Sequence, residues 1–137
     1  MNRREAREQL FTLLFRTQFT GGEDYDGIYR EELILRGLED DEYVRRVYYG
    51  IGEKLPEIDG LIAKYSSRWN SDRMSKVIRA VMRLAVYEMK YEDDIPVKVS
   101  LNEAIELAKK YDTEKAAGFV NGILNSVAQE IEAGAQE

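Results

Sequence analysis

The sequence predicts an all-α fold, a compact bundle of about seven helices in two packed subdomains. Apolar residues recur at i, i+3 and i+4 along almost the whole chain, and residues that cap or end helices separate these stretches. No segment of any length alternates apolar and polar residues as a strand does. The 137 residues are most simply one domain, 1–137, with helical subdomains at about 1–70 and 71–132 and a frayed tail at 133–137.

The first part of the chain is predicted to hold three helices. They run from 3 to about 19, from 24 or 26 to 37, and from the acidic run at 39–42 through 51. Gly21-Gly22 ends the first helix and Gly37 ends the second. Acids in the first turn of the third helix complement its dipole, so we interpret that run as structural rather than as a metal site.

The remaining helices are predicted from their opening residues. Pro56 opens one, Ser71 caps one at about 72–91, the capping box Ser100-Leu-Asn-Glu103 starts one that continues through Lys110, and Thr113 caps the last. The helix at 72–91 is apolar over most of its circumference, so we expect it at the centre of the bundle.

Composition excludes several kinds of site. The chain has no histidine and no cysteine, which removes the usual nucleophile–histidine pairs and zinc ligand sets. It has no glycine-rich phosphate loop, so we expect neither an enzyme nor a cofactor or metal. The charged N-terminus does not resemble a signal peptide and no stretch of 18 apolar residues occurs, so we expect a cytoplasmic protein that does not contact a membrane.

The first of two basic islands lies at the N-terminus of a chain whose net charge is −6. Arg3, Arg4 and Arg7 fall within an arc of about 100° at the start of the first helix. Cations oppose the dipole at that end, so the arginines indicate a bound phosphate. The alternative is a solvated, frayed terminus whose charge Glu5 and Glu8 moderate.

The second basic island lies on the helix at 72–91. Lys76, Arg79, Arg83 and Lys90 form one stripe that also contains Tyr87. Cations interleaved with an aromatic ring are typical of surfaces that hold single-stranded RNA. The alternative is a solvated face, or ion pairs with the acidic helices. Tyr65, Arg68 and Trp69 nearby could extend the island, or the aromatic rings could simply belong to the core.

Four segments, in this order and spacing, resemble the NusB family of bacterial transcription antitermination factors. They are RREAREQLF, VIRAVMRLAVYEM, IPVKVSLNEAIELAKKY and AGFVNGILN. The resemblance covers nearly the whole chain. It implies an all-helical fold and an adaptor that binds boxA RNA of ribosomal RNA leaders together with NusE, a small-subunit ribosomal protein. It further implies action on elongating RNA polymerase, with no reaction and no cofactor.

The resemblance also implies site residues. RNA-binding positions are Arg3, Arg4 and Arg7 at the start, Tyr65 in mid-chain, and Lys115, Phe119 and Asn121 around the last signature. Phe15 and Phe19 would face NusE. The start of the central helix is expected to face the same partner, and there Ile78 stands where a polar or acidic residue is expected.

The chain could be a monomer or a homodimer. The alternative function is an accessory or protein-interaction domain of an rRNA-modifying system without sequence-specific RNA binding of its own.

Asn121-Gly122 is a strong turn dipeptide inside the apolar pattern of the last helix. Glycine in a helix costs about 1 kcal/mol. We expect its missing Cβ to admit a second helix, so that Gly122→Leu would loosen the fold; an RNA backbone is the other candidate. Asn121 would either tie down a loop, such as the one at Pro96, or contact RNA.

Overall fold

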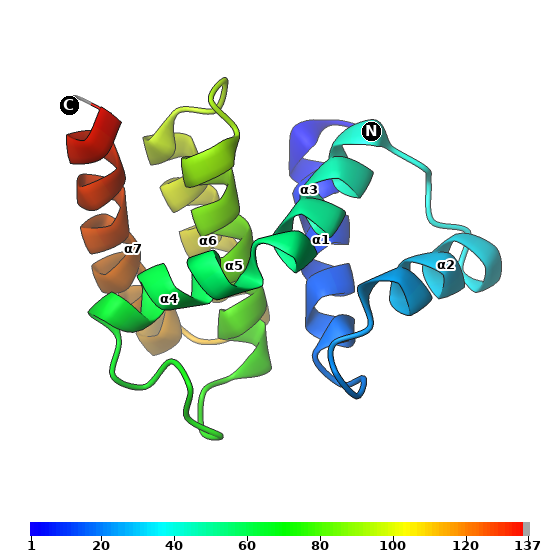
Figure 1. The fold of residues 1–137 in the computed structure, drawn as a ribbon, viewed down its shortest axis with the longest axis horizontal. Coiled ribbons are helices and arrows are strands. Elements are labelled where there is room, and N and C mark those ends of the chain that lie inside the picture. The colour runs from blue at the N-terminus through cyan, green and yellow to red at the C-terminus, as the bar shows by residue number, and fades with distance from the viewer. Residues whose placement is uncertain (136–137) are drawn as a thin grey trace. The chain divides into compact units, whose positions relative to one another are not determined.

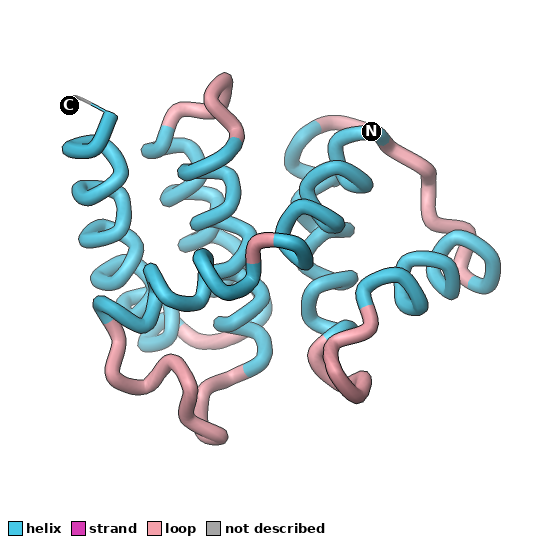
Figure 2. Tube along the Cα trace, viewed as in Figure 1, coloured by secondary structure: helices cyan, strands magenta, loops and turns pink. Residues whose placement is uncertain are grey.

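The computed structural model describes residues 1–135 and contains seven α-helices within them. Their bounds are α1 (Arg3–Thr17), α2 (Tyr25–Leu35), α3 (Glu42–Glu53), α4 (Leu55–Tyr65), α5 (Lys76–Tyr91), α6 (Val97–Tyr111) and α7 (Glu114–Ala135). The part of the chain that the structure describes has no strand (Figure 2). The all-α prediction is therefore confirmed. No helix among residues 1–135 is both long enough and apolar enough to span a membrane.

The chain divides into two compact units, Met1–Lys54 and the residues from Leu55 onward. The expected boundary near residue 70 differs from this one because α4 packs on α5 and α7 (Figure 1). Ile58 and Ile62 of α4 are fully buried, which accounts for that attachment. In the expected tail at 133–137, residues 133–135 belong to α7, and residues 136–137 lie outside the described range.

The first unit is a three-helix cluster in which each helix packs against the other two (Figure 1). Asn2, Asp24 and Asp41 cap the three helices, each accepting a hydrogen bond from a first-turn backbone N–H. The sequence allowed the second helix to start near either Asp24 or Asp26, and the structure shows that Asp24 is its N-cap. Gly37 follows α2 at φ +68°, a conformation that glycine adopts without strain.

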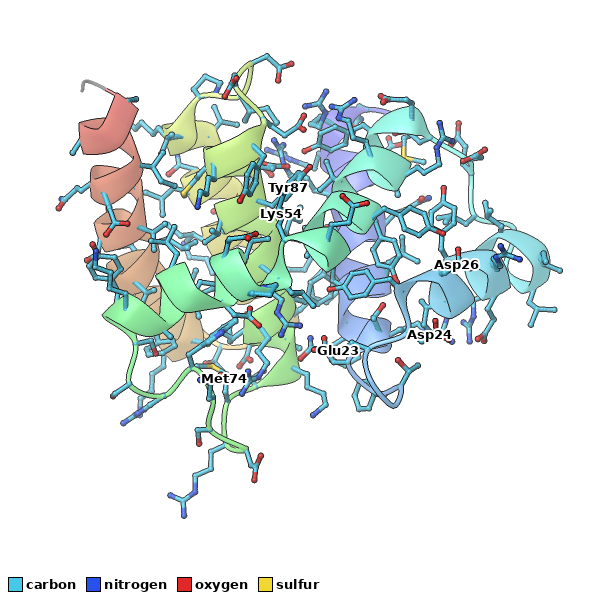
Figure 3. All side chains as sticks on the ribbon, in the orientation of Figure 1. Glu23, Asp24, Asp26, Lys54, Met74 and Tyr87 are labelled. Carbon is cyan, nitrogen blue, oxygen red and sulfur yellow. The ribbon has the colours of Figure 1, made fainter. Side chains whose placement is uncertain are left out.

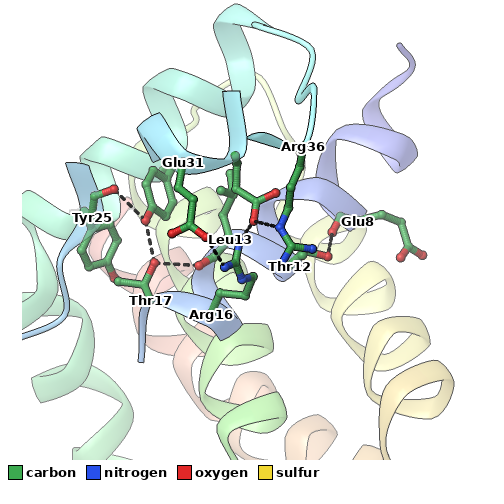
Figure 4. Close-up of polar contacts among 10 residues, drawn as sticks. Glu8, Thr12, Leu13, Arg16, Thr17, Tyr25, Glu31 and Arg36 are labelled. Carbon is green, nitrogen blue, oxygen red and sulfur yellow. Dashed lines mark hydrogen bonds and ion pairs between the residues drawn. The ribbon is translucent and has the colours of Figure 1, made fainter. Parts of the chain in front are cut away.

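Two polar networks hold the first unit together (Figure 4). The hydroxyls of Thr17 and Tyr48 lie 2.6 Å apart, and the Tyr48 hydroxyl donates to the Tyr25 carbonyl at 3.0 Å. Burial raises the pKa of Tyr48, so its phenol stays protonated at neutral pH. In the second network Arg16 pairs with Glu32 and Glu31 of α2, which joins α1 to α2 electrostatically.

In the second unit, α5, α6 and α7 pack against one another and α4 lies across α5 and α7 (Figure 1). Every α5 residue from 80 to 89 is buried, so this helix is the centre of its unit, as predicted. α5 begins at Lys76, and the cap is Ser75 rather than Ser71. Ser71 instead accepts from the Arg79 guanidinium through its carbonyl, at 2.7 Å.

The start of α6 also differs from the prediction. The helix begins at Val97, so Ser100 lies inside it and the proposed capping box does not form. The buried Ser100 hydroxyl donates to the buried Glu88 carboxylate at 2.8 Å, an interaction with α5 that the sequence pattern does not reveal. Thr113 does cap α7, since its hydroxyl accepts from the Ala116 N–H at 3.0 Å.

Helix α7 continues without a break through Asn121 and Gly122. Both residues are exposed, and a Cβ built on Gly122 would meet nothing within 4 Å. The expectation that Gly122 admits a neighbouring helix is therefore wrong. The apolar side of α7, with Val120, Ile123 and Leu124, faces the core, and that geometry turns Gly122 outward. The Asn121 amide oxygen accepts from Asn125 at 2.8 Å and not from the loop at Pro96.

Candidate functional site

A pocket of about 700 Å³ lies in the second unit, where the N-terminal ends of α5 and α7 meet the loop after α4. Residues Arg68, Ser71, Arg73 and Met74 of that loop line it. Figure 3 shows Met74 in the chain segment that leads into α5. The remaining lining residues come from the N-terminal ends of the two helices and the α6–α7 junction: Ser75, Ile78, Asp112, Thr113, Lys115, Ala116 and Phe119.

A hydrogen bond joins the two sides of this pocket. The Ser75 hydroxyl donates to Asp112 Oδ2 at 3.0 Å, and Ser75 also accepts from the N–H groups of Val77 and Ile78. Ser75 therefore caps α5 and at the same time holds the carboxylate that ends α6. Because Thr113, the next residue, caps α7, one short cluster sets the position of both helix starts.

Three cations of the pocket have no internal ion pair. Arg68, Arg73 and Lys115 are exposed, and none is ion-paired within residues 1–135. Asp112 is the only carboxylate that lines the pocket among the described residues, so its lining carries a local excess of positive charge. Ile78, Ala116 and Phe119 give it an apolar wall.

The basic stripe expected on α5 does not form a solvent-facing surface. Both Arg83 bonds to the Asp59 carboxylate measure 3.0 Å, and Arg83 is only 5% exposed. Arg79 donates to the Ser71 carbonyl, and both guanidiniums lie over the buried Trp69 ring, at 5.1 and 5.8 Å. Arg79 and Arg83 therefore stabilise the second unit.

The other members of the stripe are divided. Lys76 and Lys90 are exposed at opposite ends of α5. Tyr87, the aromatic residue expected to serve a ligand, is 8% exposed and packs on Tyr91 with ring centroids 5.0 Å apart. Of the basic residues predicted to form this stripe, Lys76 is therefore the exposed one that lies in the first turn of α5, at the end of the helix nearest the pocket.

The N-terminal arginines have unequal environments in the first unit. Arg3 and Arg4 are exposed, whereas Arg7 is 5% exposed. The Arg3 guanidinium carbon lies 3.8 Å from the centroid of the Tyr43 ring, a cation–π contact that orients it. Arg3 and Arg4 are therefore the arginines that present their side chains at the surface.

Tyr65 belongs to a polar cluster away from the pocket lining. Its hydroxyl donates to Glu130 at 2.6 Å, and Lys64 forms a short ion pair with the same carboxylate. The hydrogen bond to Glu130 raises the pKa of Tyr65, while Lys64 and Tyr65 hold the pKa of Glu130 below its usual value. The cluster joins the end of α4 to α7 and leaves the tyrosine ring half-buried.

The residues expected to face a protein partner are also unequal. Phe19 is 65% exposed just after α1, and its ring packs edge-to-face on Phe15 at 5.1 Å. Ile78 is 3% exposed and lies in the wall of the pocket, so it offers little surface to a partner.

Three of the predicted site residues, Lys115, Phe119 and Ile78, line the pocket, although Ile78 was expected to face a protein partner. Arg68 appeared only as an extension of the basic stripe, and Arg73 and Asp112 did not appear. Two arginines in a short polar loop between apolar helices were the available signal. Those arginines alone do not predict a binding site, because the pocket forms only where two segments distant in the sequence meet. The Ser75–Asp112 hydrogen bond, for example, joins residues that are 37 positions apart.

Known proteins match this chain over more than nine tenths of its length. A sequence model of the NusB family matches residues 4–129. The transcription antitermination protein NusB of Lachnoclostridium phytofermentans is 48% identical, covering 93% of this chain and 98% of that protein. The protein of the same name from Bacillus subtilis is 41% identical over 96% and 98%.

Solved structures similar to this one also belong to NusB proteins. NusB of T. maritima superposes with a TM-score of 0.84 at 43% identity, covering 95% of this chain and 92% of that one. A crystal structure of antitermination factors NusB and NusE in complex with dsRNA gives a TM-score of 0.81 at 28% identity, over 93% and 96%. These relatives are named as antitermination proteins and not as enzymes, in line with the composition. The chain belongs to the NusB family of transcription antitermination proteins.

Proposed function

We propose that this protein is an RNA-binding adaptor of the bacterial transcription antitermination complex. It binds boxA-type single-stranded RNA of ribosomal RNA leaders together with NusE, and it acts on elongating RNA polymerase in the cytoplasm. Family membership supports the role in antitermination. The similarity to a NusB that was crystallised with NusE and dsRNA supports NusE and RNA in general as partners, and the single-stranded boxA element is the finer part of the proposal.

The observation that carries the RNA-binding part of the proposal is the group of pocket cations that form no ion pair within residues 1–135. Lys115 is exposed without an ion pair among residues 1–135, and the half-buried Phe119 ring lies one turn further along the same helix. Positive charge that follows a phosphate backbone, beside a ring on which a base stacks, is the usual arrangement for single-stranded RNA. Arg68 and Arg73 extend the positive charge.

Four other surface residues complete the proposed RNA contacts. Arg3 and Arg4 contact phosphates from the first unit, and Arg7 is left with a structural role because it is buried. Lys76 adds a charge at the start of α5. Tyr65 offers a ring whose orientation its hydrogen bond to Glu130 restricts. Arg79 and Arg83 are excluded from the RNA site because Ser71 and Asp59 already bind them.

The outer face of α7 supports close approach by a ligand. Gly118 and Gly122 are one turn apart and exposed, and a Cβ on either would meet nothing within 4 Å. Each glycine costs the helix about 1 kcal/mol relative to alanine, and the described residues place no atom close enough for a Cβ at either position to clash with. An RNA backbone lying against this face would account for the open space, with Asn121 available for hydrogen bonds beside it.

Phe15 and Phe19 are the proposed contact with NusE. Phe19 is 65% exposed and packs on the half-buried Phe15, and an exposed aromatic side chain is the kind of feature that anchors protein interfaces. Ile78 is left out of this contact because only 3% of it is exposed.

The test is fluorescence anisotropy of a labelled boxA-like RNA, titrated with the protein alone and with NusE, at two salt concentrations. A scrambled RNA measures sequence selectivity. Arg3→Ala/Arg4→Ala is the test variant, and Arg30→Ala is its control, since Arg30 is exposed in the same unit but paired with Asp26 at 2.8 Å. We expect selective binding that NusE strengthens, that falls in the test variant and that persists in the control. The slope of log affinity against log salt should be about −0.7 per phosphate contacted.

One result would replace the proposal with the alternative function. If NusE binds while RNA affinity is weak and the same for both sequences, the protein is an interaction module without sequence-specific RNA binding. Phe19→Ala distinguishes the two contacts, because it should weaken the binding of NusE and leave the affinity for RNA alone unchanged.

A further inference from the structure

The pocket at the start of α5 and α7 has the size and the division of polarity of a nucleotide site. Its volume of about 700 Å³ lies within the range of about 300–1,000 Å³ that small-molecule sites occupy. One part of its lining is apolar, with Met74, Ile78, Ala116 and Phe119, and the rest is charged or hydroxylated. A flat ring bearing a phosphate is the ligand whose own polarity is divided in the same way.

The cations of the lining are suited to a phosphate. Arg68, Arg73 and Lys115 are not ion-paired within the described range, although the chain as a whole has a net charge of −6. The positive ends of two helix dipoles, those of α5 and α7, add to this field. The first turn of α5 has no acid that would oppose this field, whereas the first turn of α7 has Glu114. These groups favour a phosphate over a neutral ligand.

Asp112 is the feature that a simple anion site would lack. Its carboxylate lines the pocket, and the Ser75 hydroxyl holds it there at 3.0 Å. A carboxylate repels phosphate but accepts N–H donors, and its two oxygens have about four acceptor positions, of which Ser75 occupies one. Guanine presents adjacent N1–H and N2–H donors on one edge, whereas uracil presents a single N–H between two carbonyl oxygens. The carboxylate therefore favours guanine.

We infer that this pocket takes one unstacked guanine nucleotide of the bound RNA, with Asp112 reading the base edge, Phe119 contacting the ring, and Arg68, Arg73 and Lys115 holding the phosphate. The inference rests on the proposed function for the identity of the RNA. It adds a base-specificity residue, Asp112, and assigns Arg68 and Arg73 to the phosphate of this one nucleotide. The pocket itself can be tested without any RNA.

The experiment is an NMR titration of the full chain with each ribonucleoside 5′-monophosphate and, separately, with inorganic phosphate. GMP should shift the amide signals of residues 73–78 and 112–119 and bind about fivefold or more tightly than UMP, the minimum expected for a bidentate base contact. Lys115→Ala should weaken all four nucleotides. Lys98→Ala is the matched control, an exposed lysine at the second position of α6 as Lys115 is at the second position of α7, and it should have no effect.

Two pocket variants separate the reading of the base from folding. Asp112→Asn keeps an acceptor for Ser75 and should bring the GMP-to-UMP ratio close to one without lowering the melting temperature. In Ala116→Leu, the larger side chain projects from α7 into the apolar part of the pocket. It should abolish nucleotide binding while the Ser75–Asp112 bond remains. Retention of GMP preference in Asp112→Asn would overturn the role of Asp112.

The remaining outcomes separate this inference from the proposed function. If boxA-like RNA binds selectively but no nucleotide shifts the pocket signals, the inference fails and the adaptor function stands. If GMP binds in the pocket but RNA binding shows no selectivity, the pocket stands and the adaptor function fails. If inorganic phosphate shifts the same signals with the same affinity as GMP, the pocket is an anion site without a base contact and the inference is overturned.

Discussion

The two units use their basic residues in different ways. In the first unit most arginines pair with acids of that unit: Arg16 with Glu31 and Glu32, Arg30 with Asp26, Arg36 with Glu32, Arg45 with Asp40, and Arg46 with Glu42. In the second unit Arg83 and Lys64 are ion-paired, but Arg68, Arg73 and Lys115 are not paired within residues 1–135. The lesson is that a basic residue's role depends on whether an acid of the same unit can reach it.

The largest expected effect tests a paired cation of the second unit. Arg83→Ala should lower the free energy of unfolding by about 3 kcal/mol, because it leaves the Asp59 carboxylate without its bidentate partner and removes a guanidinium packed over Trp69. Denaturant melts measure the loss. RNA affinity per folded molecule should not change. A stable Arg83→Ala protein that no longer binds RNA would return Arg83 to the RNA site.

The second prediction tests a paired cation of the first unit. Arg16→Ala should cost about 1–2 kcal/mol, since Glu32 is 7% exposed and would keep only its contact with Arg36, at 3.4 Å. Arg30→Ala removes a pair between two exposed side chains and should cost about 0.5 kcal/mol or less. Equal losses in thermal melts of the two variants would contradict the distinction between buried and exposed pairs.

The third prediction concerns the outer face of α7. Gly122→Ala should stabilise the protein by about 0.5–1 kcal/mol, because alanine favours helix and its Cβ meets nothing within 4 Å. Gly60→Ala in α4 is the control, since Gly60 is also exposed with open space. Both should raise the melting temperature, and only Gly122→Ala should weaken RNA binding. If neither affects RNA, the open face of α7 serves no nucleic acid.

The smallest expected effect concerns the Lys64–Tyr65–Glu130 cluster. The depressed pKa of Glu130 means that its contribution to stability is present above its unfolded value, near 4.5, and is lost as pH falls through the lower folded pKa. Glu130→Gln should therefore melt slightly below wild type at pH 7 and equal it once the wild-type carboxyl is protonated. A difference that persists unchanged into acid would show that the cluster acts through packing rather than charge.

Helix positions could be predicted wherever the signal is local. Thr113 caps α7 as its sequence indicated, and α5 is buried as its apolar circumference required. The errors lie where a side chain found a distant partner. Ser100 reads as a cap but bonds to buried Glu88, and Ser71 reads as a cap where Ser75, held by Asp112, performs that role. The spacing of residues along the sequence cannot predict these partners, because they belong to other helices.

The candidate site was predictable in part for the same reason. Lys115 and Phe119 could be placed from motif resemblance alone, and both line the pocket. Arg79 and Arg83 had the same helical spacing as an exposed basic stripe, but the carbonyl of Ser71 and the carboxylate of Asp59 lie within reach of them. Periodicity gives the face of a helix on which a residue lies, not what covers that face.

The sequence by itself determined the all-α class, the family and the main helices, because periodicity, caps and motifs act over a few residues. Only the tertiary structure decided which cations are paired, which glycine is exposed and where a pocket opens. Those properties depend on contacts between segments far apart in the chain. A charge becomes structural when folding brings a carboxylate to it, and it remains available for a ligand when folding does not.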